Sequence, residues 1–73
     1  SEEALAAAEA GIGSAKAQIQ AAEAGRGRTR ADYARWQGEY NRVSDLAQRK
    51  LLDKQVVEET LNQFRSAEAA RDE

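Results

Sequence analysis

The sequence contains no cysteine, no histidine and no proline, and these absences exclude several kinds of structure and chemistry. Without cysteine the chain has neither a disulfide framework nor a reactive thiol, and its redox compartment is left undecided. Without histidine it lacks the commonest metal ligand and the commonest general base near neutral pH. We therefore expect no enzymatic activity, no catalytic residues, no metal site and no cofactor.

Aromatic residues and long apolar runs are also scarce. Aromatic residues make up 5% of the chain and charged residues 33%, a composition that suits a long helix or coiled coil better than a globule. No apolar stretch approaches the roughly 18 residues that span a bilayer. No signal peptide opens the chain and the first residue is Ser1, so we expect a fragment or a mature segment.

Two interleaved series of seam residues run along the first arm of the chain, and members of each series recur every seven residues. The series are Leu5, Ile12, Ile19, Arg26, Tyr33, Tyr40 and Ala47, and Ala8, Ala15, Ala22, Thr29, Trp36 and Val43. A sustained 3-4 spacing of this kind predicts a helix with a coiled-coil seam over about residues 2–47. If helical throughout, this arm is roughly 70 Å long at about 1.5 Å per residue.

The seam changes character along this arm. Its first half is rich in alanine, whereas the half nearer the tip carries Tyr33, Trp36 and Tyr40 and should dominate the stability, because aromatic side chains bury more apolar area. Between the halves lie Gly25 and Gly27, each of which costs about 1 kcal/mol relative to alanine in a helix interior. We expect a bend, fraying or local opening there.

A second helical pattern follows a short turn. Asp53 is a suitable capping residue, so we expect a tip at about residues 48–52 and a second helix at about 53–72. The single unit, residues 1–73, is thus predicted to be an all-α, antiparallel two-helix coiled-coil hairpin whose first helix is longer than the second. Folding the chain back at its tip brings the following residues together: Val43 and Val57, Tyr40 and Thr60 with Leu61, Trp36 and Phe64, and Tyr33 and Ala67.

The second arm is too short to cover all of the first. Residues 1 to about 25 have no partner in the folded-back chain, although their apolar stripe runs from Leu5 to Ile19. Either another copy of the chain or a further part of the second helix could cover them. For the chain by itself we expect self-association through this part of the first helix.

The tip and its flanking arms together resemble the α-helical hairpin of HlyD-like membrane fusion proteins, the periplasmic adaptor subunits of tripartite efflux pumps and type I secretion systems. The resemblance is carried by Ala15–Ala24, Asp32-Tyr33, Glu39–Arg42, Asp45-Leu46, Lys50–Gln55 and Ala67–Ala70. In that family the tip carries an arginine, a leucine four residues later and a serine seven residues after the leucine. Arg42 and Leu46 match the first two, whereas Asp53 stands where the family has serine.

The resemblance implies a non-catalytic hairpin in the periplasm, associated with the inner membrane in the intact protein. Its tip, through Arg42, Leu46 and Asp53, would dock on an outer-membrane channel of the TolC type. Neighbouring copies would stand side by side, and an inner-membrane transporter would be contacted through parts outside this chain. Arg42 could donate hydrogen bonds to partner carbonyls or carboxylates, and Leu46 could enter an apolar groove. Alternatively, both residues serve only the hairpin itself.

Two other functions remain open at this point. One is a generic dimerising coiled-coil scaffold, which would use the seam alone and leave the turn free to vary. The other is nucleic-acid binding through the arginines between Arg26 and Arg35, because closely spaced cations neutralise phosphates. On a helix these arginines point in different directions, and Glu23, Asp32 and Glu39 lie nearby. A solvated face of mixed charge is therefore favoured, and no nucleic-acid partner is expected.

Overall fold

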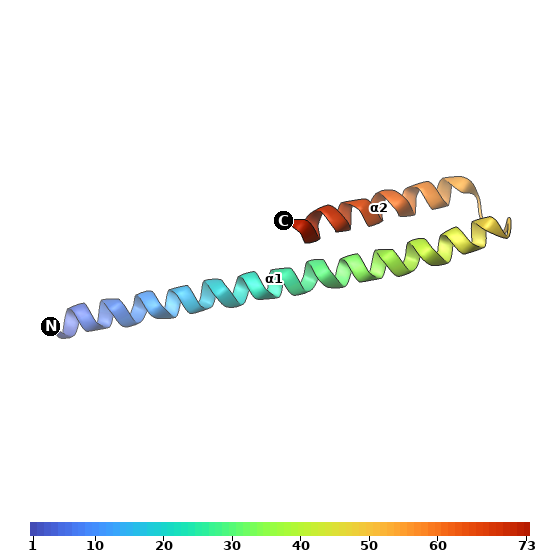
Figure 1. Cartoon of the computed structure of the whole chain (residues 1–73). Coiled ribbons are helices and arrows are strands. Elements are labelled where there is room, and N and C mark those ends of the chain that lie inside the picture. Colours follow the sequence, from blue (N-terminus) through green and yellow to red (C-terminus); the bar gives the residue numbers. More distant parts are fainter.

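The computed structural model describes all residues from Ser1 to Glu73. The chain forms two helices, α1 (Glu2–Gln48) and α2 (Lys54–Asp72), and no strands. In Figure 1 α2 folds back along the half of α1 nearest the turn, so the C-terminus lies about midway along α1. The molecule is a rod of 73 × 13 × 13 Å. The predicted all-α hairpin with a longer first helix is thereby confirmed.

Both ends of α1 are defined by local chemistry. At the start, the Ser1 hydroxyl accepts a hydrogen bond from the Ala4 amide at 3.2 Å. Glu2 and Glu3 occupy the first turn, where carboxylates favour the positive end of the helix dipole. At the other end α1 extends to Gln48, and the turn occupies residues 49–53, one residue later than predicted. Helix-forming alanines and the absence of proline account for the uninterrupted length between these ends.

The chain reverses direction without glycine or proline by closing α1 with a Schellman motif. The Lys50 amide donates to the Ala47 carbonyl at 2.9 Å, and the Leu51 amide donates to the Leu46 carbonyl at 2.9 Å. This pair of bonds satisfies carbonyls that the end of a helix would leave free. The residue after the cap, Lys50, takes the left-handed conformation that the motif requires, with φ of 61°.

Asp53 stands at the N-cap position of α2, as predicted, but its carboxylate makes no capping hydrogen bond. Its backbone is extended, and its carbonyl accepts from the Val56 amide at 3.1 Å. The first turn of α2 contains no carboxylate, and Glu59 in the second turn accepts from the Gln55 side-chain amide at 3.2 Å. The start of α2 is therefore held by backbone geometry and not by acidic side chains.

The core of the hairpin is thin and is flanked by half-buried aromatic rings. Only Val43, Thr60 and Ala67 are buried, and the Thr60 hydroxyl donates to the Val56 carbonyl at 2.8 Å. The Phe64 ring packs between two rings of α1, with centroids 5.3 Å from Tyr33 and 5.8 Å from Tyr40. These ring pairs link α2 to α1 on both sides of Phe64.

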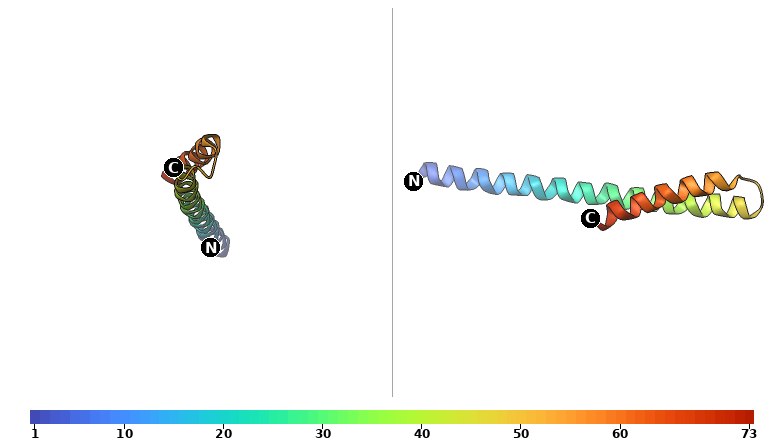
Figure 2. Two further views of the ribbon diagram at one scale, coloured as in Figure 1. Left: turned by 90° about the vertical axis from the view of Figure 1, so that its right-hand side faces the viewer. Right: turned by 90° about the horizontal axis from the view of Figure 1, so that it is seen from above.

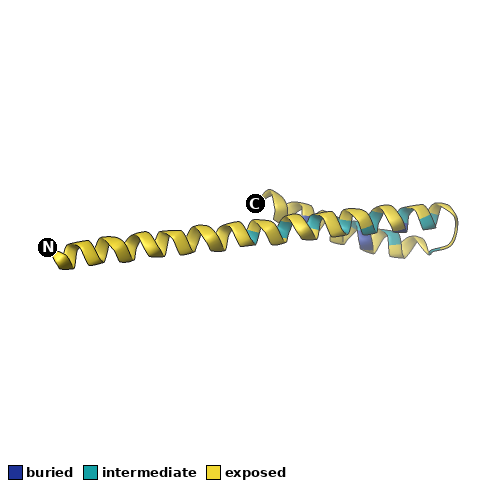
Figure 3. Ribbon diagram, turned by 90° about the horizontal axis from the view of Figure 1, so that it is seen from below, coloured by how far each residue is buried: buried dark blue, intermediate teal, exposed yellow.

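The half of α1 away from the turn has no cover. Every residue from Ser1 to Ala24 is exposed, and burial begins only at Gly25, as the uniform yellow of that half of the helix shows in Figure 3. The end-on and top views of Figure 2 likewise show the N-terminal part of α1 running on beyond α2. The heptad seam therefore continues past the point where its partner ends.

The expected bend or opening at Gly25 and Gly27 is absent. Both glycines lie within the single helix α1, and neither has a positive φ. The Thr29 hydroxyl donates to the Arg26 carbonyl at 3.0 Å in the same segment. Because helix hydrogen bonds are local, glycine lowers the stability of the helix without having to change its direction.

This effect of glycine gives a testable prediction at Gly38, within the paired half of α1. A Cβ added there meets nothing within 4 Å. We expect Gly38→Ala to raise the free energy of unfolding by about 1 kcal/mol, because alanine is the better helix former. Urea unfolding followed by circular dichroism measures the change. Gly11→Ala, in the uncovered half, is the control and should leave the unfolding midpoint of the hairpin nearly unchanged.

Candidate functional site at the hairpin tip

The tip is the end of the rod formed by the last turns of α1, residues 49–53 and the first turn of α2. Leu51 is the most exposed large apolar side chain of the molecule, at 65%. Leu52, next to it, is half-buried. The sequence pattern does not indicate which of these two leucines is exposed at the tip. In the structure it is Leu51, the residue that directly follows the left-handed Lys50.

Positive φ at Lys50 stores strain in the turn. A non-glycine residue in the left-handed region loses about 1–2 kcal/mol relative to the right-handed one. Glycine avoids this loss, but it gives up more backbone entropy on folding because it is more flexible when unfolded. The strain relief is the larger of the two, so we expect Lys50→Gly to stabilise the hairpin by a net amount of about 0.5–1 kcal/mol. Lys54→Gly, the same substitution at a helical position, should destabilise it. Thermal unfolding measures the stability of both variants. If Lys50→Gly lowers the stability as much as Lys54→Gly does, the strain assigned to Lys50 is contradicted.

Arg42 and Leu46 lie one turn apart on α1 and therefore on the same side of the helix. Leu46 is half-buried at the end of the seam. A shallow apolar hollow of about 350 Å³ also opens at the tip, where it is lined by Ser44, Ala47, Gln48, Leu52, Lys54 and Val57. Asp53 is exposed on the other side of the turn, at the start of α2. The tip thus combines exposed charge with partly covered apolar surface.

Arg42 is oriented by a neighbour on its own helix. Its guanidinium forms a forked pair with the Glu39 carboxylate, in which Nη2 donates to Oε1 and Nε donates to Oε2, the latter at 3.3 Å. The Arg42 side chain nonetheless remains 59% exposed. Arg49 and Asp45 form a second, looser ion pair at 3.4 Å nearer the turn. Such exposed pairs add little stability, so Arg42 can exchange Glu39 for another acceptor at small cost.

The same pair changes the titration of Glu39. The hydrogen bond from Arg42 holds the pKa of Glu39 below its usual value of 4.5, and the charges of Arg42 and Arg35 act in the same direction. Because the pKa of Glu39 is lowered in the folded state, the pair makes its full contribution to folding stability above pH 4.5. That contribution is lost as the pH falls through the folded-state pKa. Acid should therefore release Arg42 at a lower pH than the one at which an unpaired glutamate is protonated.

We predict that a carbon-detected NMR titration gives Glu39 a midpoint below 4.5 in the intact chain. In Arg42→Gln the midpoint should rise, because the main cause of the shift is removed. A Glu39 midpoint that stays unchanged in the variant would contradict the pairing.

The arginines between Arg26 and Arg35 do not form one patch with a common contact. Arg35 lies over the Trp36 ring, with its guanidinium carbon 4.9 Å from the centroid, whereas Arg26, Arg28 and Arg30 are exposed along the helix. Arg71 of α2 lies over Tyr33 at 3.9 Å and pairs with Asp72 at 2.9 Å. The positive charges of this region are thus distributed over aromatic rings, solvent and one carboxylate.

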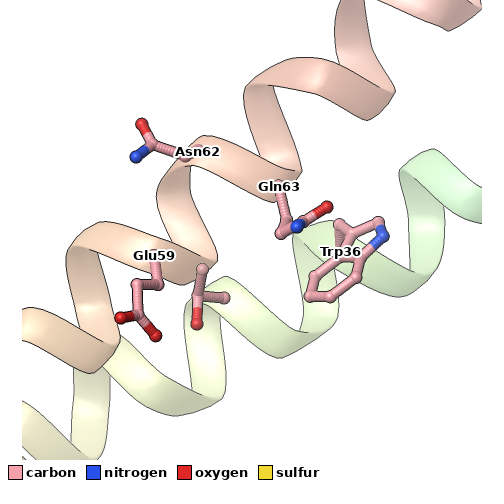
Figure 4. A pocket seen from close by; sticks show the side chains of 5 residues that line it. Trp36, Glu59, Asn62 and Gln63 are labelled. Carbon is pink, nitrogen blue, oxygen red and sulfur yellow. The ribbon is translucent and has the colours of Figure 1, made fainter.

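An open groove of about 450 Å³ lies between the helices away from the tip, and Trp36 is its single large apolar member. Figure 4 shows the Trp36 ring beside the Gln63 side chain, while Asn62 points away from it. Glu59 and Thr60 complete the lining. Because the groove is open and its lining is mainly polar, it does not enclose a small ligand or direct a set of side chains toward one.

No three histidine, cysteine, aspartate or glutamate side chains come together as metal ligands. Neither helix combines the length and apolar character that crossing a membrane requires. A comparison of the chain with protein-family models, curated proteins and solved structures finds no match. The resemblance at the tip therefore rests on its own residues.

Proposed function

We propose that the chain is the α-helical hairpin of a HlyD-like periplasmic adaptor, whose tip docks on an outer-membrane channel of the TolC type. The observation that carries the proposal is that Arg42 and Leu46, at the family's spacing, lie in the last two turns of α1, toward the turn end of a rod 73 Å long. A narrow rod with a chemically distinct end is suited to bridging a distance and making contact at that end.

The tip offers the two kinds of contact that such docking needs. Arg42 is exposed and already holds a carboxylate in a forked geometry, so a carboxylate or carbonyl of the channel could take the place of Glu39. Leu51 and the apolar hollow beside Leu52 supply surface that loses water on contact. Arginine and buried apolar anchors are the groups that most often dominate protein interfaces.

Asp53 is the point at which this chain departs from the family pattern. Its carboxylate is exposed and makes no capping bond, so its charge is available to a partner. A serine there would be neutral. We propose that the channel surface facing Asp53 carries a complementary positive or hydrogen-bond-donating group.

In this proposal the hairpin functions in the periplasm, and the intact adaptor is associated with the inner membrane. Neighbouring copies stand beside it, and the inner-membrane transporter is reached through other parts of the adaptor. Efflux or secretion through the channel is then the process that the hairpin serves, without chemistry of its own.

A dimerising scaffold segment is the second candidate, and the exposed stripe of Leu5, Ile12 and Ile19 favours it. Such a segment would use the seam and have no need of a specific tip. The two functions therefore differ in whether contacts made by residues 42–53 matter.

Site-directed photo-crosslinking distinguishes them. A photoreactive side chain at Arg49, in the turn, should crosslink to a purified channel of the TolC type, whereas the same side chain at Glu23 should not. Equal yields from the two positions, or none from either, would reject tip docking. Excess unlabelled hairpin should suppress the Arg49 product if the contact is specific.

A further inference from the structure

The uncovered half of α1 carries an apolar stripe that continues the face on which α2 packs. Leu5, Ile12 and Ile19 on this stripe are 60%, 57% and 56% exposed. Small residues separate them: Ala8, Ala15 and Ala22. We propose that a second copy of this chain covers the stripe, with the two α1 helices antiparallel and Ile12 of each copy opposite Ala15 of the other.

The position of α2 determines the direction of pairing. In a parallel dimer, the second α1 would run along the stripe toward the turn. Beyond Gly25, however, the same face is already occupied by α2, whose residues Ala70 and Arg71 line one hollow together with Gly25 and Thr29. An antiparallel α1 runs along residues 2–25 in the opposite direction and therefore does not overlap the face that α2 occupies. Figure 1 shows how straight α1 runs from one region to the other.

The side chains of the stripe fit this direction in one register. With Ile12 opposite Ala15, Leu5 faces Ala22 and Ala8 faces Ile19, and the two-fold symmetry repeats each pair. Every layer then joins one large residue to one alanine. Such layers fill space evenly while bringing the helices close together. Shifting the register by one heptad in either direction leaves part of the stripe without a partner.

Charges beside the stripe agree with this register. Glu9 and Lys16 follow Ala8 and Ala15 on one flank of the seam, where antiparallel helices bring like heptad positions together. Glu9 of each copy therefore faces Lys16 of the other, which gives two opposite-charge pairs near the two-fold axis. Glu2 faces Glu23 at each outer end, a weaker repulsion in well-solvated surroundings. The other flank has no charge and contains Ala4, Gly11, Gln18 and Gly25.

The proposed dimer has a length that scattering can recognise. Overlap of the two uncovered halves makes a rod of about 110 Å, since each helical residue advances about 1.5 Å. Small-angle scattering combined with sedimentation equilibrium, on the 73-residue chain at high concentration, should give twice the monomer mass and this length. A monomeric mass, or a dimer no longer than the 73 Å of one molecule, would overturn the proposal.

A charge exchange tests the register. Lys16→Glu and Glu9→Lys should each raise the dissociation constant about tenfold, because each turns two attractive pairs into repulsive ones. The double variant should recover the original affinity, since the pairs are restored with their signs exchanged. Arg28→Glu, which makes the same charge change as Lys16→Glu outside the overlap, is the control for net charge and should have little effect.

Failure of the double variant to recover would overturn the assigned register. Circular dichroism of each variant shows whether the hairpin itself stays folded, since its aromatic core lies beyond the changed positions. The inference concerns the 73-residue chain by itself and does not rest on tip docking: in the dimer the two tips lie at opposite ends, whereas in the proposed adaptor neighbouring hairpins stand side by side. Channel binding responds to residues 42–53 and dimerisation to residues 2–25, so either can fail without the other.

Discussion

Phe64→Ala is expected to lower the free energy of unfolding by about 2–3 kcal/mol, somewhat less than for a fully buried phenylalanine. Phe64 supplies the ring of α2 that packs between Tyr33 and Tyr40 of α1. Its removal takes away both the apolar burial and two ring contacts, each typically worth about 0.5–1.5 kcal/mol beyond burial. No neighbouring side chain can fill the gap, because the seam has only two helices.

The loss should be large enough to separate the helices. A hairpin with three buried residues has a small margin of stability, and an isolated helix as short as α2 is itself marginal in water. We therefore expect loss of α2 helicity by far-ultraviolet circular dichroism and a large fall in the urea midpoint. Leu5→Ala, which truncates a large seam residue on the uncovered half, should leave that midpoint in place. A cost below about 1 kcal/mol for Phe64→Ala would contradict the proposed role of the ring.

Arg42→Asp is expected to reduce affinity for the channel at least tenfold, or about 1.4 kcal/mol, and to do so without unfolding the hairpin. The side chain is 59% exposed, and its ion pair is with Glu39, on its own helix. Reversing its charge puts the carboxylates of residues 39 and 42 side by side and removes the guanidinium donors of Arg42. An acceptor on the channel would then meet repulsion in place of a forked hydrogen bond.

Arg28→Asp is the matched control for this variant. It makes the same charge change on the same helix, but on a residue away from the tip. Surface plasmon resonance titrations over a range of salt concentrations separate a specific contact of Arg42 from general charge attraction between hairpin and channel. General attraction weakens with salt to the same degree for both variants. Equal affinities for Arg42→Asp and Arg28→Asp would remove Arg42 from the proposed docking surface.

Periodicity alone was sufficient to predict the architecture. The heptad spacing predicted two helices of unequal length, because each run of heptad-spaced residues marks the helix face that packs against a partner. The seam residues Tyr33, Tyr40, Val43 and Phe64 do lie between the helices. Ring geometry was less predictable: Phe64 contacts two tyrosines a full heptad apart, and Trp36 lies beside polar residues of α2. Spacing fixes the height of a side chain along the seam but not its rotamer.

Local chemistry at the tip was harder to foresee. A lysine at a position that usually favours glycine gave no signal for the Schellman motif, although backbone hydrogen bonds compensate for the strain at Lys50. Asp53 occupies the N-cap position of α2 but makes no capping hydrogen bond. The residue type therefore predicted where the helix begins, but not the side-chain contact. Arg42 and Glu39, three residues apart, were within reach of each other on any helix, and their pairing is the tip feature that spacing could have shown.

Binding of the hairpin to a purified TolC-type channel tests the central claim most directly. The 73-residue chain, Arg42→Asp and Arg28→Asp should each be titrated against the channel in lipid nanodiscs. Tip docking predicts saturable binding by the unaltered chain and by Arg28→Asp, and binding at least tenfold weaker by Arg42→Asp. Absence of binding by the unaltered chain, or equal binding by all three proteins, would contradict it.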